Sequence, residues 1–399
     1  MLRKSFFRVL ALFTVMTFVG ATVGQAEVVI TKPSGRDYKN PTLFVAGITG
    51  DAEVAKIAAD NLRLCGWFDP ARNAAEADFV INGQASSSSL QLTVAGRASF
   101  VMTQPLPAAD RNHYIRKGVD MVLNKIFGIR GICATRIAFS VKSGRAKNIY
   151  IADFDGRDVK QITHHNNLCV EAEWTPDARS LIYTMYGNSN TDIIQTIINP
   201  LRSRLLVRMP GLNCGASVSP NGRMLALIAS RDKQVELYVK PINGSTMTRL
   251  TRSRAVEASP CWSSDSAKIC FVSDLGRRRP GIFVINAAGG TPQQQPTIGE
   301  EAVSPHMSSN GSIVYSCKSG GHYTLAIISK DPKVPSGVIV NQSGDWESPC
   351  WAPDNRHVIC ARNDGRGTSS LYIVDTWTLK TRLYLKGYDM TYPSWSNVY

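Results

Sequence analysis

The side chains that most often carry out chemistry are few in this sequence and form no recognised catalytic motif. Six histidines stand at positions 113, 164, 165, 306, 322 and 357. No HExxH pattern, G-x-S-x-G elbow, P-loop or G-x-G-x-x-G fingerprint occurs. His164 and His165 are adjacent, so they would face opposite sides of a strand or be solvated in a loop. We therefore predict no catalytic residue and no cofactor.

Cysteine is the second group with reactive side chains. Nine cysteines stand at positions 65, 133, 169, 214, 261, 270, 317, 350 and 360. No CxxC or Cys/His pair has the spacing of zinc ligands, so we predict no metal site. An odd number leaves at least one thiol outside any set of disulfides. Most of these residues lie in apolar stretches, where cysteine is commonly a small buried hydrophobe.

The charge is strongly basic. Lys and Arg number 45 against 31 Asp and Glu, a formal net charge of +14 over 399 residues. Such a surplus is typical of proteins that bind nucleic acid, a membrane surface or an acidic partner, and also of a merely solvated basic surface. The run Arg277–Arg279 has no interleaved aromatic residues for base stacking. We expect an exposed basic loop there and no nucleic-acid partner.

The N-terminus has the layout of an export signal. Met1–Arg8 carries three cations, Val9–Val23 is apolar and uncharged, and Gly24–Ala26 places small residues at a cleavage site. This order is that of a cleavable secretory signal peptide. The apolar stretch is short for a membrane anchor of about 20 residues. We predict that residues 1–26 are removed and that the exported mature chain has no membrane span.

A repeat organises the chain after residue 135. A tetrapeptide of the type Trp174–Asp177 recurs at Trp262 and Trp351, with weaker copies that begin at Val218 and Met307 and a truncated copy at Trp395. The first residues of the six copies are separated by intervals of 44 or 45. Short apolar runs follow every copy but the last, for example Met224–Ala229 and Val235–Val239. Such runs predict antiparallel strands, about four a repeat, which is the pattern of a propeller blade. The Trp is predicted to pack between blades and the Pro-Asp pair to form a turn.

The ends of the array indicate how the ring closes. The first unit, from Arg136–Ser140, lacks the tetrapeptide strand, and the last copy, Ser394–Ser396, has no strands after it. A blade completed by the C-terminal strand removes open sheet edges. Counting round the ring predicts six blades over residues 135–399.

Two kinds of reactive side chain can be placed on this scheme. His306 falls near the start of an inner strand, where a channel could offer a metal site, but one histidine is too few ligands. Cys261 and Cys270 would lie opposite one another in a hairpin, whereas Cys350 and Cys360 would face opposite sides of their sheet. A 261–270 disulfide is therefore conceivable. Free buried thiols are favoured, because cross-strand bridges need unusual Cα spacing.

Residues 27–130 show a different pattern, that of a small α/β domain. Asp51 is placed to cap a helix, and Asp110 to cap a second helix that ends at Gly128. Strands are predicted at Glu27–Thr31, Thr42–Ala46, Phe79–Gly83, Leu90–Ala95 and Ala98–Thr103. The predicted fold class is mainly β, a six-bladed β-propeller with a small N-terminal α/β domain.

This combination resembles the TolB family of the periplasmic Tol-Pal system. The most specific matches are Gly128–Gly131 with Thr135–Ala138, Ile151–Gly156 and Pro393–Ser396. Prolyl-oligopeptidase propellers share the repeats, but no hydrolase domain is predicted here. The resemblance implies a non-enzymatic, monomeric periplasmic scaffold. It would link the inner-membrane protein TolA to the peptidoglycan-associated lipoprotein Pal, supporting outer-membrane integrity and invagination during cell division.

The resemblance also implies where the partners bind. Pal would dock on the propeller's loop face, just before each inner strand, at Glu171, Leu212, Asn213, Gly215, Glu257, Ala258, Ser259, Glu301, Glu347, Ser348, Thr391 and Tyr392. TolA would contact the start of the mature chain, Glu27, Val28, Val29, Ile30, Thr31 and Lys32. Leu212 and Gly215 stand where the family is expected to have His and Ala. The four glutamates suggest a basic complement on Pal.

Two other classes of function compete with this scaffold. An exported propeller enzyme, such as a lyase or hydrolase, would need a base or metal set beside the acids at the channel mouth, and none is apparent. A carbohydrate- or peptidoglycan-binding propeller would show exposed aromatic residues at repeated loop positions, and only Trp346 and Tyr392 qualify. A partner-binding scaffold is the favoured interpretation.

Overall fold

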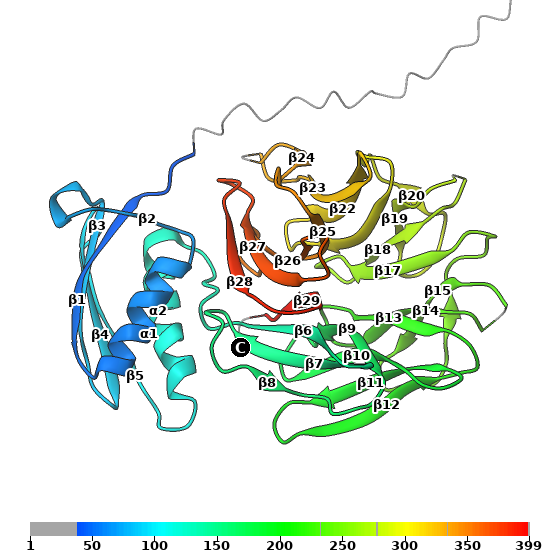
Figure 1. The fold of residues 1–399 in the computed structure, drawn as a ribbon, viewed down its shortest axis with the longest axis horizontal. Coiled ribbons are helices and arrows are strands. Elements are labelled where there is room, and N and C mark those ends of the chain that lie inside the picture. Colours follow the sequence, from blue (N-terminus) through cyan, green and yellow to red (C-terminus); the bar gives the residue numbers. More distant parts are fainter. Residues whose placement is uncertain (1–37, 232, 277, 333, 398–399) are drawn as a thin grey trace, which may run out of the picture. The chain divides into compact units, whose positions relative to one another are not determined.

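The computed structural model describes residues 38–397 except 232, 277 and 333 (Figure 1). The predicted signal peptide, the predicted strand Glu27–Thr31 and the predicted TolA segment Glu27–Lys32 lie outside the described residues. Strands dominate the described part. Its two α-helices are α1 (Ala52–Leu64) and α2 (Arg111–Phe127). Neither described helix combines the length and apolar character needed to cross a bilayer.

The first described elements form an α/β layer. Their five-stranded sheet has the order β2-β1-β3-β4-β5. The strands are β1 (Thr42–Gly50), β2 (Asp69–Pro70), β3 (Phe79–Ala85), β4 (Ser89–Gly96) and β5 (Phe100–Pro105), with a 3-10 turn at Ala74–Glu76. Four of these strands and both helices are predicted from the sequence, whereas the short β2 and the 3-10 turn are not. One hydrophobic cluster joins the helices, the sheet and part of the propeller.

The ends of the two helices test the caps predicted from the sequence. The Asp51 side chain accepts hydrogen bonds from the N–H groups of Glu53 and Val54, so the predicted cap of α1 is confirmed. Gly128 ends α2 in the left-handed region at φ 68°, also as predicted. The predicted cap at Asp110 is wrong. This residue is itself left-handed, at φ 63°, and its carboxylate makes no capping bond, because a cap needs an extended backbone to aim the side chain at the first turn.

The remaining described strands build a β-propeller. Four sheets of four strands can be traced in the described residues, each in chain order. They are β13 (Asn213–Val218), β14 (Met224–Ala229), β15 (Glu236–Pro241), β16 (Thr248–Arg249); β17 (Glu257–Trp262), β18 (Lys268–Ser273), β19 (Gly281–Asn286), β20 (Gln293–Gln294); β21 (Ala302–Met307), β22 (Ile313–Ser319), β23 (His322–Ile328), β24 (Gly337–Val338); and β25 (Asp345–Trp351), β26 (His357–Asn363), β27 (Ser369–Asp375), β28 (Thr381–Leu385).

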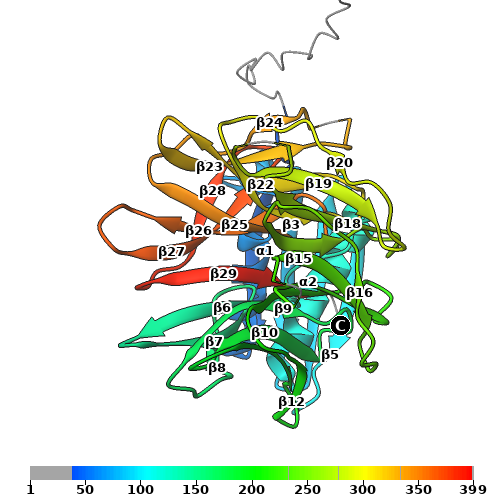
Figure 2. The same ribbon diagram turned by 90° about the vertical axis from the view of Figure 1, so that its right-hand side faces the viewer.

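The ring closes through the C-terminal strand. An eight-stranded sheet contains β29 (Met390–Trp395), β6 (Arg136–Ser143), β7 (Ala146–Asp153), β8 (Lys160–Gln161), β9 (Leu168–Trp174), β10 (Ser180–Tyr186), β11 (Thr191–Ile197) and β12 (Arg202–Arg208). β29 pairs antiparallel with β6, as the repeat predicts (Figure 2). Two four-strand halves of this sheet meet at a single parallel pair, Lys147 with Leu168. The described strands accommodate six blades if each half is one blade, and the count stays a prediction.

The repeated tetrapeptides act as predicted. Trp174 and Trp262 are buried, and their indole Nε1 atoms donate to the Ser394 and Ser217 carbonyls of neighbouring inner strands. Asp265 accepts the Ala267 N–H and so closes its turn. Both features are structural, because they hold adjacent sheets together and reverse the chain.

The cysteine register is also as predicted. Cys261 lies opposite Cys270, whereas Cys350 lies opposite Ile359 and not Cys360. All nine cysteines are described, and each is a free thiol in this structure.

Candidate functional site: the propeller channel and its mouth

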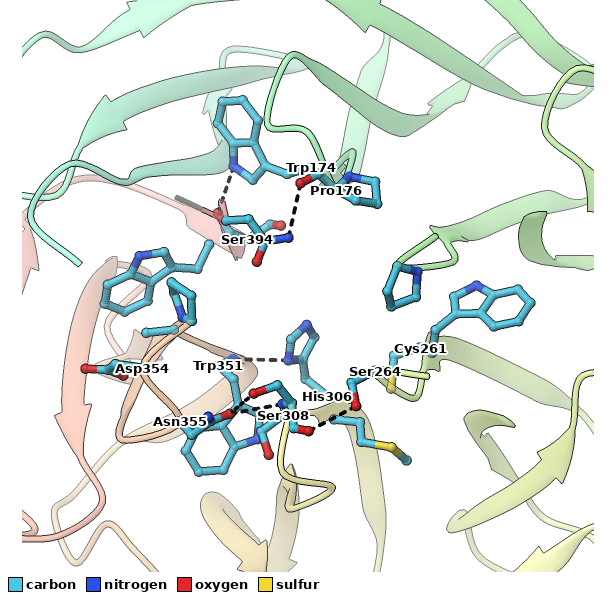
Figure 3. A pocket seen from close by; sticks show the side chains of 18 of the residues that line it. Trp174, Pro176, Cys261, Ser264, His306, Ser308, Trp351, Asp354, Asn355 and Ser394 are labelled. Atoms are coloured by element: carbon cyan, nitrogen blue, oxygen red, sulfur yellow. Dashed lines mark hydrogen bonds between the residues drawn. The ribbon is translucent and has the colours of Figure 1, made fainter. Parts of the chain in front are cut away.

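The innermost strands β9, β13, β17, β21, β25 and β29 surround two adjoining cavities. The larger has a volume of about 570 Å³ and the smaller about 130 Å³, and both are lined by Glu173, Cys261, His306 and Ser394. The larger cavity is bounded by the tetrapeptide turns and by residues 128–130. In Figure 3 the His306 ring projects into it, between Trp351 and Cys261. We call the opening at the smaller cavity the mouth.

One residue from each inner strand lines the channel at an equivalent position. We call these six the channel ring, namely Glu173, Ser217, Cys261, His306, Cys350 and Ser394. Each immediately precedes a tetrapeptide, so the ring shares the 44- or 45-residue spacing. Sequence reasoning missed the ring because its residue types differ from unit to unit. The spacing alone could have revealed it.

His306 is held in a form that does not favour metal binding. It lies near the end of β21, not near the start of a strand as predicted. Its Nδ1 accepts the Trp351 N–H at 3.1 Å, and its Nε2 lies 3.6 Å from the Cys350 sulfur. The accepting role of Nδ1 puts the proton of the neutral ring on Nε2, so neither nitrogen offers a free lone pair. No three described His, Cys, Asp or Glu residues are grouped as metal ligands.

The ring is also poorly suited to proton transfer or nucleophilic attack. Desolvation lowers the pKa of His306 to about 4 and raises the pKa of Cys350 to about 12. At neutral pH the first is a weak base and the second a protonated, unreactive thiol. Desolvation raises the pKa of Glu173 to about 8, and this carboxyl accepts a hydrogen bond from the Ser217 hydroxyl at 2.9 Å. A carboxyl group with a raised pKa can act as a general acid, but the neighbouring residues of the channel ring supply no activated nucleophile.

The mouth is shaped by a bulge repeated in every inner strand. One residue in each adopts a left-handed backbone, with φ between 48° and 58°, where the strand pairing shifts register. These residues are Glu171, Gly215, Ser259, Ser304, Ser348 and Tyr392. A bulge re-aims side chains, and left-handed backbone is disfavoured for all but glycine. The six therefore form a built rim, which we call the bulge rim.

The structure places the twelve residues predicted for Pal around this rim. Glu171, Gly215, Ser259, Ser348 and Tyr392 line the smaller cavity. The prediction that the twelve precede the inner strands is wrong for ten of them, because the strands begin earlier than the apolar pattern suggests. Only Leu212 and Glu301 lie just ahead of a strand, while Asn213, Glu257, Ala258, Glu347 and Thr391 lie within strands.

Two of the twelve are internal supports. Asn213 is fully buried, and its amide donates to the carbonyls of Thr191 and Met209 at 2.8 Å. Glu257 is 2% exposed, and its carboxylate lies within reach of the Ser273 hydroxyl. Both hold the rim from within.

The four predicted glutamates differ in charge. Burial raises the pKa of Glu171, whose carboxylate accepts from Gly215 N–H and Thr184 Oγ1 at 3.0 Å. Burial raises the pKa of Glu257 to about 7, and burial with the Asp345 charge raises that of Glu347. The pKa of Glu301 is lowered, because the Tyr323 hydroxyl donates to it at 2.7 Å. Glu301 is therefore the one of the four whose pKa favours the ionised form, and its carboxylate also pairs with the Lys318 ammonium at 3.3 Å.

Exposed aromatic and apolar side chains also lie near the mouth. Tyr388 is 79% exposed, and Leu168, Tyr186 and Tyr392 are between 38% and 39% exposed. Leu168 pairs with Tyr186 and with Lys147, whose Nζ lies 5.9 Å from the Tyr392 ring centroid, so Leu168, Tyr186 and Tyr392 are contiguous. The sequence pattern also predicts that Trp346 is exposed. That expectation is wrong, because Trp346 is fully buried and donates to the Gln342 carbonyl.

The basic run and the paired histidines are peripheral. Arg279 forms an ion pair with Glu300 at 2.9 Å on the surface, and Arg277 lies outside the described residues. His164 and His165 are exposed in a loop, one of the two predicted placements.

The seam between the α/β layer and the propeller was missed from the sequence. Arg356 is fully buried, donates twice to Asp375 and once to Asn40, and lies over the rings of Trp67 and Trp377. Tyr38 packs on the same guanidinium, at 5.4 Å. The described chain therefore starts at an anchored point on the propeller.

Comparisons with known proteins agree with this architecture. A family model described as the TolB beta propeller domain matches residues 123–399. The Tol-Pal system protein TolB of Desulfosudis oleivorans is 31% identical over 144 residues, which are 36% of this chain and 33% of that protein. The same-named protein of Bordetella pertussis is 27% identical over 283 residues, 59% of this chain and 64% of that protein.

A solved structure extends the comparison at the level of the fold. The crystal structure of TolB from Acinetobacter baumannii has a TM-score of 0.80 at 20% identity and covers 90% of this chain and 97% of its own. The sequence matches above span a third and just under two thirds of the curated relatives' lengths. The family model, which covers more than half of the chain, establishes the family, and the solved structure establishes the fold.

Proposed function

The chain belongs to the TolB β-propeller family, and on that premise we propose that it is a non-enzymatic, partner-binding component of a Tol-Pal system in the periplasm. The propeller docks the peptidoglycan-associated lipoprotein Pal, and Glu27–Lys32 recruits the inner-membrane protein TolA. The monomeric chain thereby links the two membranes and supports outer-membrane integrity and invagination during division. Its parts are a signal peptide (1–26), an α/β domain (27–130) and a propeller of six blades (135–399).

The combination of carboxylates and exposed tyrosines at the mouth is the observation that carries the Pal proposal. Glu301 lies just ahead of β21, Glu347 lies in β25 and Tyr392 lies in the neighbouring strand β29, while Tyr186 and Tyr388 are exposed. Tyrosines are enriched in protein interfaces, and charged rims steer complementary partners. A docked globular domain would thus place a basic residue against Glu301 and an apolar one against Tyr388. An interface of about 1,600 Å² in total suits this role.

The anchor at Arg356 supports a separate role for the N-terminal segment. Tyr38 and Asn40 are bound to this buried guanidinium, so the chain is fixed just after the segment assigned to TolA. Removing residues 27–32 should therefore leave the mouth intact.

The test is a binding titration with Pal from the same organism. The pair Glu301→Lys and Glu347→Lys should weaken Pal binding by at least about tenfold, and Tyr388→Ala should weaken it as well. The control pair Glu53→Lys and Glu76→Lys makes the same change in net charge on the α/β layer and should leave the affinity unchanged.

Deletion of residues 27–32 separates the two partners. TolA binding should be lost and Pal binding retained. Absence of Pal binding to the unmodified chain, or equal affinities for the mouth and control variants, would refute the assignment of Pal to the mouth.

A further inference from the structure

The outermost strands of the propeller sheets differ greatly in length. β8, β16, β20 and β24 have two residues each, β28 has five and β12 has seven. A long outer strand presents a row of unpaired N–H and C=O groups, and natural proteins usually shorten or cover such edges. The four two-residue strands are shortened in this way. β12 and β28 are not.

β28 is covered by the chain itself. The Lys380 ammonium beside it forms an ion pair with Asp69 of the α/β layer at 2.7 Å. Tyr384 is buried in the hydrophobic cluster that joins the α/β layer to the propeller, and its hydroxyl donates to the Asp153 carbonyl. A long outer strand in this molecule thus already serves as a packing surface.

β12 has no such cover among the described residues. It pairs on one side with β11, and no described strand pairs with its other side. In both views it is the outermost strand of its sheet (Figures 1 and 2). Alternate residues of an antiparallel strand direct their backbone groups to opposite sides, so about half of the N–H and C=O groups of β12 point outward.

The side chains along this edge are basic and apolar. Arg202, Arg204 and Arg208 are exposed, and residues 197–209 contain no acidic residue. Arg208 is neutralised by Asp192 at 2.6 Å, and Arg204 donates only to the neutral side chains of Gln195 and Asn243. Beside them, Ile197, Leu201 and Leu205 are 39%, 54% and 45% exposed.

We propose that the free edge of β12 docks an extended, acidic segment of a partner protein, which adds a strand to this sheet. Main-chain hydrogen bonds supply affinity in this mode, and alternate side chains supply specificity. Carboxylates on the added strand would pair with Arg202 and Arg204, and apolar residues would cover Leu201 and Leu205. A second copy of this chain fits less well, because its own β12 would bring arginines against arginines.

The probe is a fluorescent, end-capped peptide of alternating Glu and Val residues, titrated into the full chain. The double variant Arg202→Glu with Arg204→Glu should weaken its binding at least tenfold. The control variant Arg145→Glu with Arg366→Glu makes the same charge change at exposed turns and should bind as the unmodified chain does. Methylating alternate backbone nitrogens of the peptide should abolish binding, because that removes the main-chain donors.

Hydrogen–deuterium exchange locates the site. Bound peptide should protect residues 201–208 from exchange, and Pal binding should be unaffected in the double variant, which separates this surface from the mouth. The proposal is overturned by absence of binding at millimolar peptide, by equal affinities for the edge and control variants, or by protection elsewhere. It is also overturned if sedimentation shows the chain forming dimers through β12.

Discussion

Replacing Glu173 by Gln tests the electrostatic account of the channel ring. The Glu173 carboxyl faces the channel, accepts from Ser217 Oγ and has no cationic partner among the described residues. Gln keeps the shape and the accepting oxygen but cannot ionise. The substitution therefore isolates the free-energy cost of a charge at this position.

The size and sign of the effect follow from the pKa of Glu173. Desolvation raises this pKa from its ordinary value of 4.5 to about 8. Between these values the folded chain holds a proton that the unfolded chain has released, so the free energy of unfolding falls as pH rises. The slope is about 1.4 kcal/mol per pH unit, and the full interval corresponds to about 5 kcal/mol. Screening by solvent at the channel reduces this free-energy difference, and we expect the ionised carboxylate to cost about 2–3 kcal/mol of stability.

The assay is urea unfolding followed by tryptophan fluorescence at pH 5, 6, 7 and 8. Glu173→Gln should match the unmodified chain near pH 5 and exceed its stability by about 2–3 kcal/mol at pH 8. Glu76→Gln, at an exposed site, is the control and should show no difference at either pH. Parallel pH profiles for Glu173→Gln and the unmodified chain would mean that the ring carboxyl is ionised at little cost, contrary to this reasoning.

Three further substitutions test the seam, the sheet of the α/β layer and the bulge rim. Arg356→Leu should lower the free energy of unfolding by about 3–5 kcal/mol, because it leaves the Asp375 carboxylate buried without its cationic partner. The control Arg366→Leu, at an exposed turn, should change the free energy of unfolding little. Equal urea midpoints for the two variants would contradict this role of Arg356. Gly50→Ala should prevent stable folding, since its Cβ would lie 2.0 Å from a carbonyl oxygen. Gly215→Ser should cost only about 1–2 kcal/mol, since other bulges carry serine there; thermal melts of both variants decide.

The propeller could be predicted because its signal is repeated. Four of the six copies begin with a Trp, the copies carry an Asp or Asn for the turn, and the same spacing recurs along the chain. Closure by β29 also follows from the sequence, since the first unit lacks a strand that the last unit supplies. In the α/β layer the capping of α1 by Asp51 follows from local chemistry. Asp110 shows the limit of such local prediction. Its residue type favours a helix cap, but its left-handed backbone prevents the side chain from capping α2.

The mouth and the seam could not be predicted in the same way. Left-handed bulges occur at Glu171, Ser348 and Tyr392, residue types that give no local sign of positive φ. Arg356 follows a turn, where an arginine is usually solvated. It is buried because Asp375 and the indole rings of Trp67 and Trp377, which are remote in the sequence, surround it in the fold. Tertiary packing determines both the left-handed bulges and the burial of Arg356, and the preferences of single residues are too weak to predict them.

The contrast between interior and surface bears on the kind of function. Inside the channel, desolvation shifts the pKa values of Glu173, His306 and Cys350 toward their neutral forms, so these three side chains present little charge at neutral pH. At the mouth, the hydrogen bond from Tyr323 keeps Glu301 ionised, and Tyr388 remains mostly exposed. Groups that recognise another protein need charge and apolar area at the surface, whereas groups that catalyse need activated side chains in a shielded cavity. This distribution favours recognition at the rim over chemistry in the channel.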